Sequence, residues 1–234
     1  NFRKTVQTVE DLERYNLPLI GKIPYLKTNG NAKPKEVDKS LVTYYRPFSH
    51  SAELYRKLRT NIQFSSVDKK IKTLLITSHN PKEGKTTLTG NLGMIYANMD
   101  KKVLLVDADL RKSNLHNILN IENDIGLADY LIGEVELKDI IKPTVNENLY
   151  IITAGQPPPN PAELINSQKM KGLVSKLRSH WDITIYDTPP LEPVTDSLLL
   201  SKSVDYIVIT SFSNRKKKAM KYKYDKYYKY NYKD

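Results

Sequence analysis

The chain has 234 residues, 39% hydrophobic content, a formal net charge of +11 and no cysteine. This length supports one sizeable core with appendages, and the lack of cysteine excludes disulfides, zinc–thiolate sites and cysteine nucleophiles. No apolar run exceeds four residues, so we expect neither a membrane-spanning nor a secretory segment. The first residue is Asn1 rather than Met, which suggests a domain cut from a longer chain.

Residues 1–48 differ in character from the sequence that follows. Thr8 and Asp11 predict the start of a short helix over residues 8–15, and the apolar stretch 17–25 predicts a strand. The lysine-rich stretch 30–40 contains Gly and Pro and is the best linker candidate. We therefore place a domain boundary near residue 48.

Residues 49–212 alternate apolar strand-like runs with helical patterns. The runs are apolar throughout, which is typical of a parallel sheet covered by helices on both faces. The predicted fold class is therefore α/β, with a doubly wound, mostly parallel sheet. The predicted strands cover residues 72–78, 102–109, 149–155, 182–188 and 204–211. Helices are expected from Lys85, in pieces up to Ile141, and from Pro161, where Asn160 is the predicted cap.

A phosphate-binding loop is predicted between the first of these strands and the helix from Lys85. Gly84 allows the backbone to approach phosphates, Lys85 brings a positive charge, and Thr86 offers a hydroxyl to magnesium. The match to the general pattern is incomplete, because His79 stands where that pattern has Gly.

Carboxylates end two later strands. Asp107 and Asp109 lie two residues apart, on the same side of an extended chain, and Asp187 ends a later strand. Carboxylates at parallel strand ends beside a phosphate loop can hold hydrated magnesium. Taken singly, each is better explained as a solvated strand-end Asp; the ordered set of three motifs favours a nucleotide site.

These motifs together resemble the Walker A, A′ and B motifs of the bacterial tyrosine kinases. They are PKEGKTT from Pro81, DADLR from Asp107 and DTPP from Asp187, and ELYRKLRTNI, IGLADYLIG and GQPPPNPAELI fit the same family. The resemblance implies a P-loop NTPase-type kinase domain over residues 49–212. Residues 1–48 are similar to the juxtamembrane stretch between the second membrane helix and the kinase domain of capsule and exopolysaccharide chain-length regulators.

The resemblance implies roles for individual residues. Asp107 would accept the proton of the attacking tyrosine, since a phenol that ionises near pH ~10 is a poor nucleophile at neutral pH. Arg111 either orients the carboxylates, touches phosphate, or forms a purely structural ion pair. ATP would be bound by Pro81, Glu83, Gly84, Lys85, Thr86 and Thr87, and Mg²⁺ by Thr86, Asp109 and Asp187.

Glu53, Arg56 and Arg59 form an E-x-x-R-x-x-R pattern, which the family uses for contacts between subunits. On a helix they lie opposite an apolar face, so one side can pack on its own domain while the other meets a neighbour. Without the resemblance, an ordinary solvated helix face with Glu–Arg pairs would be the favoured explanation.

The C-terminal segment 213–234 is rich in lysine and tyrosine. From Arg215 to the end, nine Lys and Arg stand against two Asp, which is +7 of the net charge. We expect a disordered tail that either solubilises the chain, binds anionic membranes, or presents phosphate acceptors. About 20 residues at ~3.3 Å each reach on the order of 60 Å, far enough to enter a neighbouring subunit. The candidate acceptors are Tyr222, Tyr224, Tyr227, Tyr228, Tyr230 and Tyr232.

Four features depart from the family pattern. Lys82 stands where the family usually has Gly, and Tyr186 takes a usually aliphatic position before the Walker B Asp. Asn80 replaces the extra lysine of the related partitioning and arsenite ATPases, which argues against that class. After Phe212 the chain goes directly to the tail, where the family has a further helix and strand; either a segment is deleted or separate segments are joined.

The leading functional hypothesis is an ATP-dependent protein-tyrosine autokinase that trans-phosphorylates the tail of neighbouring subunits and regulates capsular or exopolysaccharide polymerisation and export. Its expected partners are a ring-like homo-oligomer of itself, a membrane-embedded polysaccharide co-polymerase, and sugar-nucleotide enzymes as further substrates. Nucleic acid is not expected, because the excess charge belongs to the tail. The expected location is the cytoplasmic face of the bacterial inner membrane. The alternatives are a catalytically weak, nucleotide-dependent oligomerisation switch and a basic-tail membrane-surface module.

Overall fold

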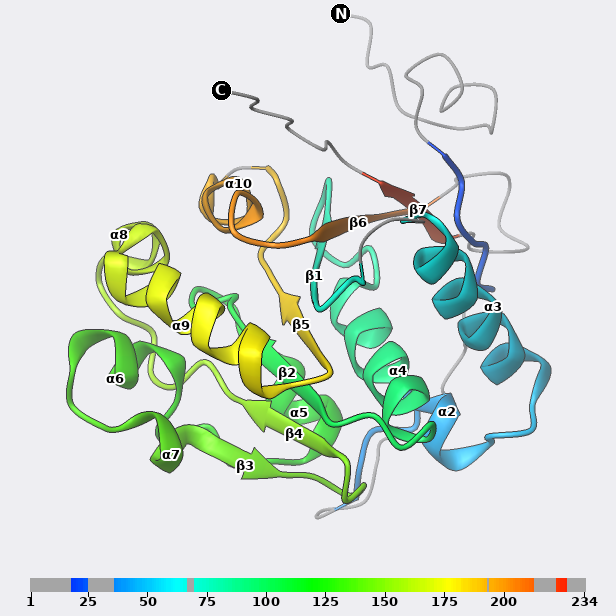
Figure 1. Cartoon of the computed structure of the whole chain (residues 1–234), viewed down its shortest axis with the longest axis horizontal. Helices are drawn as coiled ribbons and strands as arrows, with labels where there is room; N and C mark the ends of the chain where they lie inside the picture. Colours follow the sequence, from blue (N-terminus) through cyan, green and yellow to red (C-terminus); the bar gives the residue numbers. More distant parts are fainter. Residues whose placement is uncertain (1–17, 25–35, 67–69, 193, 213–221, 227–234) are drawn as a thin grey trace, which may run out of the picture.

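A computed structural model describes residues 18–24, 36–66, 70–192, 194–212 and 222–226 (Figure 1). The predicted helix over residues 8–15 lies outside the described residues. Four of the candidate acceptors also lie outside them: Tyr227, Tyr228, Tyr230 and Tyr232.

The described strands form one seven-stranded sheet in the order β3-β4-β2-β5-β1-β6-β7. The five central strands run parallel, and β3 and β7 pair antiparallel at the two edges. This confirms the predicted mostly parallel sheet. The strands are β1 Thr73–Ser78, β2 Val103–Asp107, β3 Ile141–Pro143, β4 Leu149–Ile152, β5 Ile183–Asp187, β6 Tyr206–Phe212 and β7 Tyr222–Lys226.

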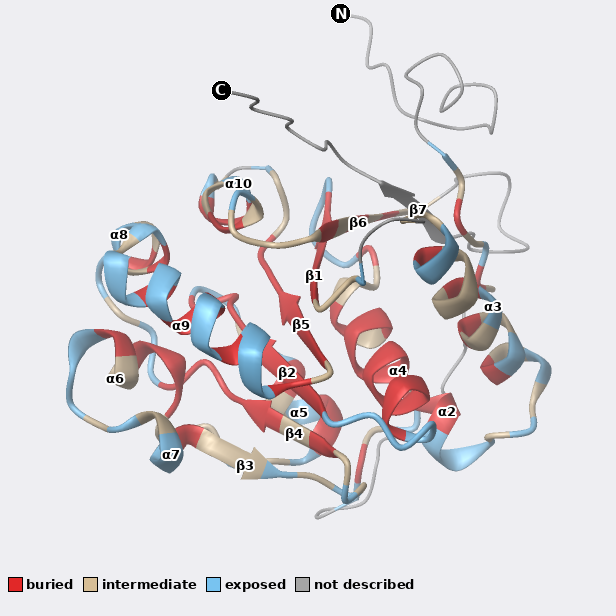
Figure 2. Ribbon diagram, in the orientation of Figure 1, coloured by how far each residue is buried: buried red, intermediate tan, exposed pale blue. Residues whose placement is uncertain are grey.

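Helices cover both faces of the sheet, as predicted, and each face has its own apolar cluster (Figure 2). Four helices pack on one face: α2 Val42–Tyr45, α3 His50–Phe64, α4 Lys85–Ala97 and α5 Leu115–Leu119. Five pack on the other: α6 Leu127–Ile132, α7 Leu137–Ile140, α8 Pro161–Asn166, α9 Gln168–His180 and α10 Asp196–Ser201. Asn160 precedes α8 but makes no side-chain cap hydrogen bond, contrary to the predicted cap.

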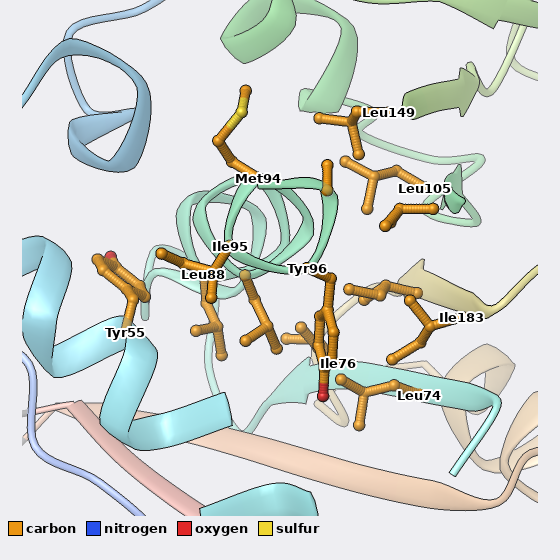
Figure 3. Packing of buried hydrophobic residues seen from close by; sticks show 14 of the residues in the cluster. Tyr55, Leu74, Ile76, Leu88, Met94, Ile95, Tyr96, Leu105, Leu149 and Ile183 are labelled. Carbon is orange, nitrogen blue, oxygen red and sulfur yellow. The ribbon is translucent and has the colours of Figure 1, made fainter. Parts of the chain in front are cut away.

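Helix α4 packs closely on the centre of the sheet. A Cβ atom at Gly93 would lie 2.7 Å from Leu105 Cδ2, so a larger residue would push α4 away from β2. Figure 3 shows the apolar side chains around this helix, among them Leu88, Ile95 and Tyr96. The helix that follows the predicted phosphate loop is therefore held firmly against the strands.

The segment before α3 joins the same core. Ile20, Ile23 and Leu41 are buried in the cluster that contains α4. Asn91 on α4 donates from Nδ2 to the carbonyls of Ser40 and Thr87, at 2.9 and 2.8 Å. Its Oδ1 accepts from the backbone N–H and the hydroxyl of Thr43. The predicted boundary near residue 48 stays a prediction, since described residues on both of its sides share one core.

Three local predictions need correction. Residues 18–24 contain a single bridge residue, Pro24, instead of the predicted strand; Pro18 and Pro24 lack the N–H groups that a strand ladder needs. Strand β3 was not predicted, because its three residues are too short to show a pattern. The predicted tail disorder does not hold for Tyr222–Lys226, which pair with β6 as an edge strand. Tyrosine-rich sequence without Gly or Pro has high strand propensity, and β6 offers a free edge.

Asp205 fastens the end of the sheet away from the strand-end carboxylates. Its Oδ2 accepts from the backbone N–H groups of Lys72 and Thr73 and from the Thr73 hydroxyl, each within 3.0 Å. Its Oδ1 pairs with Arg178 of α9 at 2.5 Å. One carboxylate thus joins β1, β6 and α9.

We expect Asp205→Asn to lower the free energy of unfolding by about 2 kcal/mol, because charge-assisted hydrogen bonds are lost at a half-buried site. Urea unfolding of parent and variant measures this. Asp182→Asn, which removes the charge of a carboxylate bonded to Lys102 N–H alone, is the control with a smaller expected loss. Equal losses in the two variants would contradict the role given to Asp205.

Candidate nucleotide and phosphoryl-transfer site

The predicted phosphate loop lies between β1 and α4. Ser78 Oγ donates to the Asn80 carbonyl at 2.7 Å, and the buried Glu83 carboxylate accepts from Asn80 N–H at 2.9 Å. Gly84 has φ 82° and precedes the first residue of α4, Lys85. The loop is thus closed by its own hydrogen bonds, with the amino end of a 13-residue helix at its base. Such an end favours phosphate, because its backbone N–H groups are free and its dipole is positive.

Lys82, the departure from the family's usual Gly, has φ 65°. A non-glycine residue in this left-handed region carries strain of roughly 1–2 kcal/mol. Lys82→Gly removes this strain, but glycine's greater conformational freedom in the unfolded chain costs about 0.5–1 kcal/mol of stability. We therefore expect a slightly more stable protein, by up to about 1 kcal/mol. Thermal unfolding measures this, and Lys101→Gly, at an exposed position without positive φ, should destabilise instead; a Lys82→Gly protein that unfolds more easily would contradict the expectation.

Lys85 and Asp109 form an ion pair across the site. Lys85 Nζ lies 3.0 Å from Asp109 Oδ2, and the two side chains are only 11% and 4% exposed. Burial alone would lower the pKa of Lys85, but the carboxylates of Asp187 and Asp109 raise it above its ordinary value. Lys85 is therefore held as a cation that faces the carboxylates at the strand ends.

Asp107 is fully buried, and both of its oxygens accept backbone hydrogen bonds. The donors are Asp109 N–H at 3.2 Å and Leu115 N–H at 3.0 Å. Burial raises the pKa of Asp107 well above its ordinary value, and the nearby charge of Asp187 raises it further. The carboxylate thus shapes the loop after β2 and also has the raised proton affinity that a general base needs.

Asp187 lies beside Asp107, since the two are partners in the register of β2 and β5. Its Oδ1 accepts from the Thr89 hydroxyl at 3.4 Å, and Thr86 also hydrogen-bonds to the carboxylate. Burial raises the pKa of Asp187 above its ordinary value. Thr89 was missed by sequence reasoning, because it lies outside the motif, one helical turn after Lys85.

Magnesium fits this site. Asp187 Oδ2 is buried and has no hydrogen-bond partner in the described part of the chain, so it is a buried acceptor that suits a cation or its water. Thr86 lies at the start of α4 beside Asp187. In the described residues no group of three or more acidic, His or Cys side chains could hold a metal alone. Magnesium usually binds through one or two carboxylates together with water and substrate phosphates.

Arg111 contacts a residue that the sequence did not single out. Its Nε and Nη2 donate to the two oxygens of Asp196, at 2.8 and 3.3 Å. Asp196 is 1% exposed, and it raises the pKa of Arg111 through these bonds. Of the three roles considered for Arg111, the structure shows the ion pair; direct contact with phosphate stays a prediction.

The predicted interface residues lie on α3. Glu53 and Arg56 form an ion pair at 2.9 Å, and Arg56 also donates to the Pro47 carbonyl. Arg59 donates to the Thr60 hydroxyl, and its Nε is buried without a partner in the described part of the chain. The structure therefore brings Lys85 and Thr86 together with the carboxylates of Asp107, Asp109 and Asp187. The three predicted interface residues instead contact residues of α3 or of the segment just before it. Of the candidate acceptors, Tyr222 and Tyr224 belong to β7.

An AAA-domain family matches residues 72–220 of the chain. The tyrosine-protein kinase YwqD of Bacillus subtilis (strain 168) is 39% identical over 189 residues, which cover 80% of each protein. The structure of the chimerical protein CapA2B2 superposes with a TM-score of 0.80 at 35% identity, covering 90% of this chain and 88% of that one.

More distant structures resemble the same core. The kinase domain of the Escherichia coli tyrosine kinase ETK gives a TM-score of 0.79 at 31% identity, with 88% and 81% coverage. The septum site-determining protein MinD of Pyrococcus horikoshii, complexed with Mg-ADP, gives 0.52 at 29% identity, with 59% and 56% coverage. A search of the described residues for a helix long and apolar enough to cross a bilayer found none.

Proposed function

We propose that this chain, which belongs to the bacterial tyrosine-protein kinase family, transfers the γ-phosphoryl group of ATP to tyrosines in the tails of neighbouring copies. One observation carries the proposal: the Lys85 ammonium and the carboxylates of Asp109 and Asp187 meet at the amino end of α4. This arrangement suits a nucleotide triphosphate with its magnesium ion, and mirrors the sites in which charge neutralisation drives phosphoryl transfer.

In this proposal the loop residues Pro81, Glu83, Gly84 and Thr87 surround the phosphates, and Lys85 leaves Asp109 to contact them. Thr86, Asp109 and Asp187 would hold magnesium, which would supply neutralisation of the charge that develops on the phosphate oxygens. The tyrosine oxygen bonds to the γ-phosphorus while the bond from that phosphorus to the β–γ bridging oxygen breaks. The phenolic proton passes to Asp107, and the products are phosphotyrosine and ADP.

The proton transfer requires that a tyrosine can reach the carboxylate of Asp107. Both of its oxygens accept backbone N–H groups, so a tyrosine can reach them only when the loop between Asp109 and Leu115 shifts. If an Asp107→Asn variant phosphorylates tyrosine at the parent rate, Asp107 is not the proton acceptor. The main contribution of the site to catalysis would then be its electrostatics.

The wider setting follows from the family. We propose a ring-like homo-oligomer in which Glu53, Arg56 and Arg59 contribute to subunit contacts, at the cytoplasmic face of a bacterial inner membrane. There the chain would work with a membrane-embedded polysaccharide co-polymerase in capsular or exopolysaccharide export, with sugar-nucleotide enzymes as further substrates. The similarity to the CapA2B2 chimera supports a two-part assembly of this kind.

The test is to incubate the purified chain with ATP and Mg²⁺ and to map phosphotyrosine by mass spectrometry. The matched control replaces all six tail tyrosines by phenylalanine, which keeps the aromatic rings and removes the acceptor oxygens. We expect phosphate on the tail of the parent alone. No phosphotyrosine in the parent, or equal phosphorylation of the control at other tyrosines, would contradict the proposal.

A second function, a nucleotide-dependent switch with little transfer, is favoured by β7. Five tail residues, two of them candidate acceptors, pair with β6 in their own subunit. Residues so paired cannot extend into another site until the ladder opens. Bound nucleotide without phosphotyrosine, measured in the same incubation, would select the switch.

A further inference from the structure

The first turn of α10 contacts the loops that follow β2 and β5, and also the end of strand β1. Asp196 and Ser197 begin this helix, and each is 1% exposed. Neither belongs to a predicted motif. Both are polar and buried, so each needs partners, and those partners lie at the nucleotide site.

Asp196 holds the loop after β2. Its carboxylate accepts two hydrogen bonds from Arg111 in a fork-like arrangement. Arg111 comes two residues after Asp109, whose Oδ1 accepts from Lys112 N–H at 3.0 Å. A bidentate Arg–carboxylate pair is more directional than a single ion pair. The position of Asp109 is thereby linked to α10.

Ser197 holds the loop after β5. Its hydroxyl donates to the Pro189 carbonyl, which also accepts from the Thr77 hydroxyl at 2.8 Å. Pro189 comes two residues after Asp187, and Thr77 lies near the end of β1, just before the phosphate loop. One helical turn therefore contacts the loop that bears Asp109, the loop after Asp187, and the strand that leads into the phosphate loop.

We propose that Asp196 is a positioning residue for phosphoryl transfer: through Arg111 it sets the placement of Asp109 relative to Asp187 and magnesium. This rests on the proposed kinase function. The ion pair joins α10 to the loop that carries Asp109, and Ser197, the next residue of α10, contacts the loop that follows Asp187. Metal ligands must be held within about 0.5 Å of their productive positions, so a loose loop lowers turnover before it lowers nucleotide affinity.

The variants are Asp196→Asn, which keeps the size of the side chain, and Arg111→Lys, which removes the fork at a 38%-exposed side chain. We expect a fall in kcat of about 10- to 100-fold, since a displacement of about 1 Å can cost that much. We also expect at least a several-fold higher Mg²⁺ concentration for half-maximal nucleotide binding. Nucleotide affinity measured without Mg²⁺ should change less than twofold, because Lys85 and α4 are untouched.

Asp205→Asn is the matched control, since Asp205 also pairs with an arginine but lies at the other end of the sheet. It should lower stability while leaving kcat and the Mg²⁺ requirement unchanged at temperatures where the protein is folded. An unchanged kcat and Mg²⁺ requirement in Arg111→Lys overturns the proposal even where Asp196→Asn fails to fold. If the parent transfers no phosphate, the kinase proposal is contradicted. The positioning role of Asp196 is then decided by the Mg²⁺ dependence of nucleotide binding in the parent and the variants.

Discussion

Lys85→Met is expected to lower tail phosphorylation by at least about 100-fold, since it removes the cation that would neutralise charge on the transferring phosphoryl group. Lys85 is the partner of Asp109 and faces Asp187, so methionine also leaves two buried carboxylates without their counter-charge. Phosphotyrosine measured by mass spectrometry, together with the Kd for ATP, reports both effects. We expect weaker nucleotide binding as well as lost transfer.

Lys101→Met is the control for losing a lysine, because Lys101 is exposed in the turn before β2. It should match the parent in both measurements. A Lys85→Met protein that retains most of its phosphotyrosine would show that the loop lysine does not contact the phosphates, and would contradict the proposed site.

Asp187→Asn is expected to abolish most of the activity and yet stabilise the protein in the absence of nucleotide. Activity should fall by about 100-fold or more, because a metal ligand is lost. Stability should rise, because burial raises the pKa of Asp187, which means that its charged form is disfavoured in the folded protein. Asparagine keeps an oxygen for Thr89 and carries no charge. A gain of about 1 kcal/mol corresponds to about 2–4 °C in Tm for a domain of this size.

The pH dependence of Tm provides a second test of the effect of Asp187 on stability. The folded protein binds a proton on Asp187 more tightly than the unfolded chain does. The stabilisation from that proton is complete below the unfolded pKa, near ~3.9, and is lost as the pH rises through the raised folded pKa. The Tm of the parent without nucleotide should therefore rise when the pH is lowered from neutral towards that raised pKa, and the rise should be smaller in Asp187→Asn.

Asp124→Asn is a control of opposite sign. The hydrogen bond from the Ile125 backbone holds the pKa of Asp124 below its ordinary value, with a smaller contribution from Lys142. Its charged form is therefore favoured in the folded state, and its loss should not raise Tm. A decrease in Tm for Asp187→Asn would show that the attraction of Lys85, together with the bonds from Thr86 and Thr89, outweighs the burial of the charge.

The central sheet and the nucleotide site could be predicted because their signals are local. Strand β1 ends at Ser78, where the loop to Gly84 begins, and strands β2 and β5 end at Asp107 and Asp187. The ends of parallel strands meet at one edge of a sheet. The sequence showed that Lys82 stands where the family usually has Gly, but its positive φ was found only in the structure.

The contacts that hold the site were not predictable from one sequence. Arg111 and Asp196 are separated by 85 residues, and no local pattern marks Asp196 as its partner. The two backbone bonds of Asp107 depend on how the loop after β2 folds back, which residue types alone do not determine. At the sheet edges, β3 and β7 form because neighbouring strands offer free backbone groups, so their existence depends on tertiary context.

The four bonds of Asn91 have a mechanical consequence. They fasten Ser40 and Thr43, upstream of α3, to the carbonyl of Thr87 in the first turn of α4. A pull on residues 40–43 would therefore be transmitted to α4 through the Asn91 side chain. Hydrogen bonds that are loaded one after another resist a load poorly, whereas bonds that are loaded together share it. The four bonds here all act on the Asn91 side chain. Helix α4 and the segment before α3 would therefore move together under such a load.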